Sequence, residues 1–190
     1  MGYREAYLMS AADLPDLTGI KLLVLDVDGV MTDGRIMLTP NGDEIKAFHV
    51  RDGAGMKYWK RAGGKLAVIT GRGSQAVLKR AEELDVDFVR LNAKDKLPVL
   101  NDVMAEMNMG PEQVAVIGDD LTDVPMARVC GFSAAVADAV DELKEVASYT
   151  TLLPGGAGCV REVIELILKA TGKWPDILKR YFPDNEEAVQ

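Results

Sequence analysis

The chain has 190 residues, a length that suits one domain with a full hydrophobic core and is short for two. Hydrophobic residues make up 48% and charged residues 27%, the composition of an ordinary globular protein. The net charge of −8 argues against a nucleic-acid partner, and no apolar run reaches the roughly 18 residues of a membrane span. Cys130 and Cys159 have neither metal-ligand nor disulfide spacing, and the N-terminus has no signal-peptide pattern, so we expect a cytoplasmic protein.

Short apolar runs alternate along the chain with segments of helical spacing. The apolar runs, which indicate buried parallel strands, span 21–27, 65–70, 87–91, 113–118 and 132–136. The segments of helical spacing span 54–61, 74–84, 96–107, 123–129 and 160–170. This alternation predicts an α/β protein with a Rossmann-like parallel sheet and helices on both of its faces.

Residues 34–50 interrupt the alternation with two strand-like runs around Asn41-Gly42, a strong β-hairpin signal. A hairpin inserted after the first strand is expected to lie over the carboxyl end of the sheet. No other connection is long enough for a lid domain, so we expect a site that is open or closed by another copy of the chain. Residues 173–190 are expected to form a short helix and a polar end, which leaves one domain over 1–190.

Candidate functional residues gather where the apolar runs end. Ligands of an open α/β sheet bind beyond the carboxyl ends of its strands. The residues that end or follow the runs are, in order, Asp26, Asp28, Thr70, Gly71, Arg72, Lys94, Lys96, Asp119, Asp120 and Asp123. Acids, a hydroxyl and lysines at one edge are the groups that phosphoryl transfer uses for positioning and charge stabilisation.

The two aspartates after the first run predict a covalent mechanism. Asp26 and Asp28 are expected on the same side of the strand, since side chains two residues apart share a face. One carboxylate would attack phosphorus, and the other would exchange a proton with the leaving oxygen. Mg²⁺ suits such a site, with Asp26 and Asp119 as ligands and Asp120 and Asp123 in secondary positions.

Two further residues would hold the phosphoryl group. Thr70 is expected to donate a hydrogen bond to a phosphoryl oxygen, and Lys96 to offset the developing charge. Taken singly, an acid after a strand is often a helix cap, and a lysine is usually solvated. The prediction depends on the joint order of the motifs along consecutive strands.

These motifs resemble the haloacid-dehalogenase-like (HAD) phosphohydrolase superfamily. The matching segments are DVDGVMTDG (26–34), ITGR (69–72), Lys96 and GDDLTD (118–123). The resemblance implies Asp26 as nucleophile and Asp28 as general acid/base. It also implies Mg²⁺ bound by Asp26, the Asp28 backbone carbonyl and Asp119, with Thr70 and Lys96 on the phosphoryl group.

Longer segments resemble one family within the superfamily, the capless, tetrameric 3-deoxy-D-manno-octulosonate 8-phosphate phosphatases of lipopolysaccharide sugar synthesis. They are FHVRDGAGMK (48–57), VAVIGDDLTDVPMA (114–127) and PGGAGCVREVIELIL (154–168). Lys94 competes for the third-motif position, but Asp-Lys-Leu leading into a helix favours Lys96. In this family the hairpins of four subunits interlock and a neighbour's tail helps to cover the site, which would supply the missing lid.

The implied substrate is a phosphorylated eight-carbon keto acid. Arg72 is the candidate for gripping its carboxylate, with Gly71 and Arg51 as further substrate contacts. Relatives that act on a nine-carbon sugar acid phosphate carry an acidic residue at the position of Arg72.

Three alternatives remain: a phosphatase for the nine-carbon compound, a non-catalytic HAD-like oligomerisation module, and a response-regulator receiver. The receiver is disfavoured because the third apolar run, 87–91, ends without an acid.

Overall fold

A parallel sheet of six strands forms the centre of the protein. The computed structural model describes residues 14–182. The strands are β1 (Leu22–Leu25), β4 (Lys65–Ile69), β5 (Phe88–Arg90), β6 (Val114–Gly118), β7 (Phe132–Ala135) and β8 (Tyr149–Thr150). Their order in the sheet is β5-β4-β1-β6-β7-β8, and every neighbouring pair is parallel. The predicted parallel α/β sheet is therefore confirmed.

The central strands end level with one another. Leu25 at the end of β1 pairs with Val68 of β4 and with Ile117 of β6. All four residues of β1 are fully buried, as expected for a strand that is covered on both faces. This register brings the residues that follow β1, β4 and β6 to one edge of the sheet.

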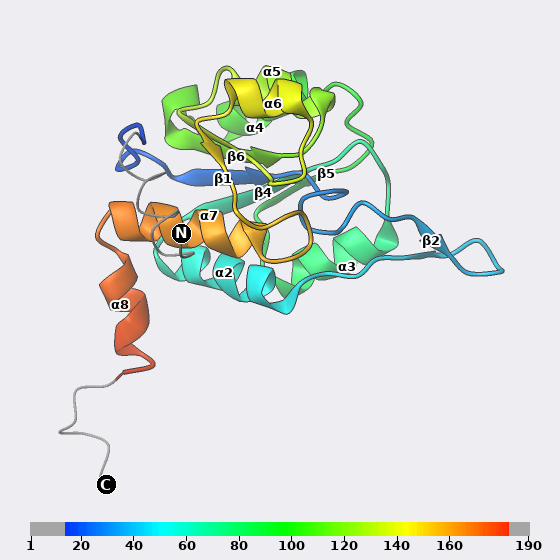
Figure 1. Ribbon diagram of the computed structural model, residues 1–190, viewed down its shortest axis with the longest axis horizontal. Coiled ribbons are helices and arrows are strands. Elements are labelled where there is room, and N and C mark those ends of the chain that lie inside the picture. The colour runs from blue at the N-terminus through cyan, green and yellow to red at the C-terminus, as the bar shows by residue number, and fades with distance from the viewer. Residues whose placement is uncertain (1–13, 183–190) are drawn as a thin grey trace, which may run out of the picture.

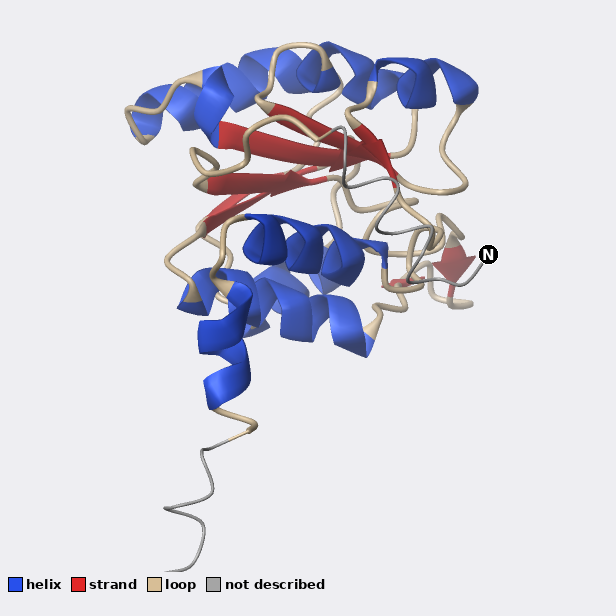
Figure 2. Ribbon diagram, turned by 60° about the vertical axis from the view of Figure 1, so that its left-hand side comes forward, coloured by secondary structure: helices blue, strands red, loops and turns tan. Residues whose placement is uncertain are grey.

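Helices cover both faces of the sheet (Figures 1 and 2). On one face lie α2 (Val50–Arg61), α3 (Gln75–Glu83) and α7 (Cys159–Ala170). On the other lie α4 (Lys96–Glu106), α5 (Val124–Ala127) and α6 (Asp141–Val146). Helix α7 shows why these segments pack as they do: Val160, Val163, Ile164 and Ile167 recur at helical spacing, and all four are buried.

Helix α2 begins earlier than predicted. The helical spacing in the sequence predicted a helix over 54–61. In the structure the helix begins at Val50 and its glycines serve close packing. A Cβ on Gly55 would lie 2.9 Å from the Arg161 side chain of α7, so a larger residue would force the two helices apart.

Several short elements were not predicted. Helix α6 and strand β8, with two 3₁₀ turns at Pro111–Gln113 and Leu121–Asp123, are too short to show a periodic apolar pattern. Helix α5 is shorter than its predicted span of 123–129. Strand β8 extends the sheet beyond β7 at the edge opposite β5.

The predicted hairpin is present, with a short paired region. Strands β2 (Met37–Leu38) and β3 (Glu44–Ile45) are antiparallel and form a separate two-stranded sheet. Gly42 in the turn has a φ of +87°, which explains why the Asn-Gly signal succeeded. The hairpin projects from the rest of the protein (Figure 1).

Beyond α7 the chain continues into α8 (Trp174–Lys179), the short helix predicted for the tail. Trp174 contacts Tyr58 of α2 edge to face, with ring centroids 6.0 Å apart. Residues 183–190 of the predicted tail lie outside the described residues, as do residues 1–13. Within residues 14–182, no helix combines the length and apolar character that crossing a membrane requires.

Candidate active site

A cavity of about 380 Å³ opens where β1, β4 and β6 end. Its lining residues are Asp26, Asp28, Thr70, Gly71, Arg72, Ala93, Lys94, Lys96, Asp119, Asp120 and Thr122. Nearly all of the candidates from the strand ends therefore surround one space. Two candidates do not line it: Asp123 lies beneath, fully buried, and Arg51 is exposed at the start of α2.

Asp26 and Asp28 reach the cavity by a route that differs from the predicted one. Strand β1 ends at Leu25, so both aspartates lie beyond it, and Asp28 is in a turn. The alternation of side chains along a strand therefore does not place them, and that argument was wrong. The turn requires Gly29, which has a φ of +98° and no room for a Cβ beside the Asp119 carboxylate.

Lys96 joins the buried acids of the cavity floor. Its Nζ donates hydrogen bonds to Asp26 Oδ1 at 2.8 Å and to Asp123 Oδ1 at 2.7 Å. The side chain of Lys96 is 4% exposed, whereas Lys94 is exposed at the rim. The geometry thus favours Lys96 over Lys94 as the lysine of the phosphoryl site.

Asp123 supports the loop after β6. Its Oδ2 accepts hydrogen bonds from the backbone nitrogens of Asp119 at 3.1 Å and Asp120 at 3.4 Å. With its other oxygen on Lys96, this carboxylate fixes both the lysine and the loop that carries Asp119.

Burial shifts the protonation of these acids. Burial raises the pKa of Asp26 to about 6, although the Lys96 charge opposes the shift. Burial, with the charges of Asp26 and Asp123, raises the pKa of Asp119 to about 8. Burial alone would lower the pKa of Lys96, but the charges of Asp26 and Asp123 outweigh it and raise this pKa. The single positive charge of Lys96 is therefore too little to balance the carboxylates of Asp26, Asp119 and Asp123 if all three are ionised.

The donor set fits a divalent cation. Carboxylate oxygens of Asp26, Asp119 and Asp123 lie within 4.8 Å of one another. Hard oxygen donors with excess negative charge are what Mg²⁺ prefers. Since both oxygens of Asp123 are already occupied by hydrogen bonds, Asp26 and Asp119 are the better side-chain ligands.

Asp28 faces a different set of partners. Lys46 Nζ contacts Asp28 Oδ1, and Arg72 Nε lies 3.5 Å from Asp28 Oδ2. Glu44 accepts a hydrogen bond from Arg72 Nη2 at 2.7 Å. Sequence reasoning missed Glu44 and Lys46, although both lie in the predicted hairpin at a spacing that gives a shared face on an extended strand; β3 itself ends at Ile45.

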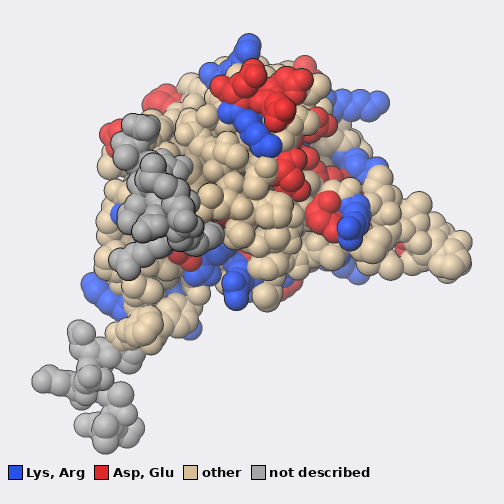
Figure 3. Space-filling view, viewed as in Figure 1, with Lys and Arg blue, Asp and Glu red and all other residues tan. Residues whose placement is uncertain are grey.

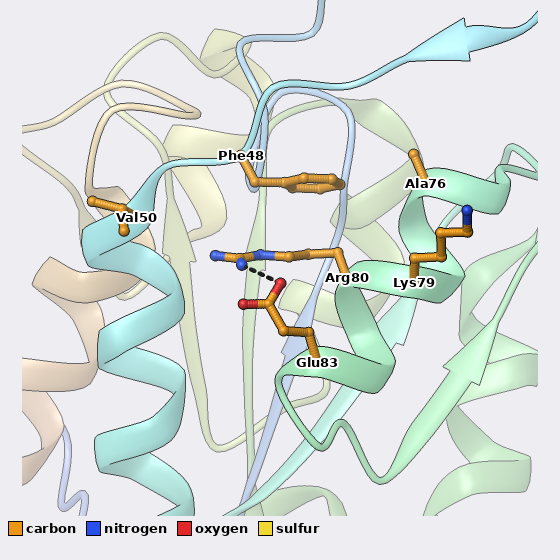
Figure 4. A pocket seen from close by; sticks show the side chains of 6 residues that line it. All are labelled: Phe48, Val50, Ala76, Lys79, Arg80 and Glu83. Carbon is orange, nitrogen blue, oxygen red and sulfur yellow. Dashed lines mark hydrogen bonds and ion pairs between the residues drawn. The ribbon is translucent and has the colours of Figure 1, made fainter.

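A second cavity, of about 450 Å³, lies between the start of α2 and α3 (Figure 4). The Arg80 guanidinium lies under the Phe48 ring, 5.8 Å from its centroid, and donates to Glu83 at 2.7 Å. Its lining contains no nucleophile beside a base and no cluster of acids, so we place the chemistry at the strand ends.

The fold and the acidic strand ends define a haloacid dehalogenase-like hydrolase, and the family model with that description matches residues 91–158. The chain is 42% identical over 165 residues to the 3-deoxy-D-manno-octulosonate 8-phosphate phosphatase of Escherichia coli K12. That alignment covers 87% of this chain and 88% of the relative.

Solved structures agree with this similarity. The phosphatase of the same name from Yersinia pestis superposes with a TM-score of 0.82 at 43% identity, covering 84% of this chain and 86% of that one. The phosphatase of the same name from Moraxella catarrhalis was solved in complex with magnesium ion, phosphate ion and a molecule of the sugar acid KDO. It superposes with a TM-score of 0.85 at 37% identity, covering 95% of this chain and 99% of that one. The chain belongs to the 3-deoxy-D-manno-octulosonate 8-phosphate phosphatase family.

Proposed function

We propose that the protein is a magnesium-dependent phosphatase that hydrolyses 3-deoxy-D-manno-octulosonate 8-phosphate to the free sugar acid and phosphate, a reaction of lipopolysaccharide sugar synthesis. The observation that carries the proposal is the buried Asp26, hydrogen-bonded to Lys96 beside Asp119 at the floor of the cavity. The activity named for relatives 37–43% identical supports the choice of substrate.

The chain's own residues supply a two-step reaction. The Asp26 carboxylate attacks phosphorus, the bond from phosphorus to the sugar oxygen breaks, and Asp28 gives a proton to the departing oxygen. Water then attacks the aspartyl-phosphate while Asp28 takes up its proton, which releases phosphate and restores Asp26. Asp26, Asp119 and the Asp28 carbonyl would hold Mg²⁺, which would supply positive charge to offset the negative charge of the phosphoryl group.

Two other residues hold the phosphoryl group. Lys96 supplies a fixed positive charge, and Thr70, only 2% exposed at the end of β4, supplies a hydroxyl donor. Their rigid placement matters because donors that are already oriented need no reorganisation as charge develops.

Arg72 is the proposed contact for the substrate carboxylate. Its guanidinium is half-exposed at the rim, and Gly71 leaves the approach free of a side chain. A planar guanidinium grips a carboxylate through two hydrogen bonds. Arg51 stays a candidate only for a site completed by another subunit.

We further propose a capless homotetramer of single-domain subunits in the cytoplasm, with the hairpins in the interface. Ile36, Leu38 and Ile45 of the hairpin are each more than half exposed, and the face of this projection that Figure 3 shows has few charged side chains. Exposed apolar surface of this kind marks an interaction site. The unpaired Cys130 and Cys159 suit a reducing compartment.

A non-catalytic module is the weaker alternative, since it has no need for a buried nucleophile, lysine and second acid in one cavity. The test is phosphate release with Mg²⁺ from the eight-carbon substrate and its nine-carbon analogue in parallel, with Asp26→Asn as the inactive control. We expect preference for the eight-carbon compound and loss of activity in EDTA. Preference for the nine-carbon compound would refute the specificity, and no release from either would refute the proposed function.

A further inference from the structure

The hairpin directs two charged side chains toward the cavity. Glu44 opens β3 and Lys46 follows its last residue, Ile45. Glu44 and Lys46 contact Arg72 and Asp28 of the cavity lining, whereas Ile45 between them is 52% exposed. The Lys46 side chain is only 1% exposed, although it lies on a short surface hairpin. Burying a lysine ammonium is costly unless it is paired with acids, so the acids that Lys46 contacts indicate why it is buried.

Those partners form a closed ring of alternating charge. Lys46 Nζ contacts Asp28 Oδ1 and lies 3.4 Å from Glu44 Oε1. The same Glu44 oxygen accepts from Arg72 Nη2 at 2.7 Å, and Arg72 Nε lies 3.5 Å from Asp28 Oδ2. Each oxygen of Asp28 thus faces one cation, and Glu44 ties the two cations together.

Asp28 depends on these contacts for its orientation. It lies in a turn beyond β1, where no strand or helix fixes the direction of its side chain. Asp26, by contrast, is held from the other side of the cavity by Lys96 at the start of α4. The two carboxylates therefore have separate supports, one from the core and one from the hairpin.

We propose that Lys46 is the positioning residue for Asp28, and that the hairpin thereby sets the geometry of proton transfer. Glu44 restrains Lys46 and holds Arg72 at the rim. The inference rests on the proposed function in one respect, that Asp28 exchanges protons in a phosphatase reaction; it does not depend on which sugar phosphate is the substrate.

The test uses the full-length protein with Mg²⁺ and p-nitrophenyl phosphate as well as the sugar phosphate. Lys46→Met should lower kcat for the sugar phosphate roughly 100-fold, the low end of what general acid/base catalysis supplies, with KM changed less than about threefold. Lys46→Arg, which keeps a cation at this position, should recover at least about tenfold of that loss. With p-nitrophenyl phosphate, whose leaving group departs without a proton, the Met variant should still release a first equivalent of p-nitrophenolate rapidly.

Lys60→Met is the matched control, since Lys60 also bridges two acids, Asp85 at 3.2 Å and Asp87 at 2.8 Å, away from the cavity. Its kcat should stay within about twofold of wild type. Should Lys46→Met not fold, as judged by melting temperature and elution volume, Lys46→Gln takes its place with the same expected rescue by Arg.

If the wild-type protein is active and Lys46→Met leaves kcat unchanged, or if Lys46→Arg is as slow as Lys46→Met, the proposed role of Lys46 is overturned and the proposed function stands. A wild-type protein inactive on both substrates would overturn the proposed function with it.

Discussion

Replacing Lys96 with methionine tests the electrostatic account of the cavity floor. The Lys96 ammonium lies between Asp26 and Asp123, and all three side chains are at most 6% exposed. Methionine fills a similar volume without the charge, so the change isolates the ionic interaction. It leaves two buried carboxylates with no cation between them.

The expected loss of stability is large. Removing one member of a buried ion pair typically costs about 3–5 kcal/mol, because the remaining charge stays buried and unpaired. For a chain of this size each kcal/mol lowers the melting temperature by roughly 2–4 °C, so the metal-free variant should melt roughly 6–20 °C below wild type. Lowering the pH to about 5 should narrow the gap, because protonation of Asp26, whose pKa burial raises to about 6, removes one of the unpaired charges.

Circular dichroism melts of both proteins in EDTA, at about pH 7.5 and pH 5, provide the measurement. Lys60→Met serves as the control, because its partner Asp85 is 89% exposed and its partner Asp87 keeps a second cation, Lys65 at 2.8 Å, so neither acid is left buried and unpaired. A Lys96→Met protein that melts within about 3 °C of wild type, or a gap that does not shrink at low pH, would refute the reasoning.

Two further predictions concern the metal and the hairpin. In EDTA the melting temperature should fall between pH 6 and pH 9, since the folded state favours protonated Asp26 and Asp119, with pKa values raised to about 6 and about 8, and that stability is lost as the pH rises through them. Mg²⁺ should therefore raise the melting temperature more at pH 8.5 than at pH 6; an equal increase at both would contradict these shifts. Leu38→Asp should reduce the molar mass found by light scattering while Val129→Asp, 43% exposed on a loop, should not; an intact tetramer in the Leu38 variant would exclude the hairpin as its interface.

Much of the fold could be predicted because its signals are local. Continuous apolar runs mark β1, β4 and β6 since a strand covered on both faces has no polar side to show. The turn at Asn41-Gly42 was visible because a positive φ favours glycine. Helix α6 and strand β8 were not visible, because each is too short for a periodic pattern and forms only by packing on its neighbours.

The sequence by itself determined which chemistry-bearing residues follow each strand: Asp26, Thr70, Lys96 and Asp119 are found around one cavity because parallel strands end at a common edge. Their catalytic roles stay predictions. Only the tertiary structure decided how the charges pair, that Lys96 links Asp26 to Asp123 and that Glu44 and Lys46 of the hairpin meet Asp28 and Arg72. The succession of strands and helices along the chain follows from local patterns, whereas an ion pair between residues 70 positions apart depends on how the helices and the hairpin dock against the sheet.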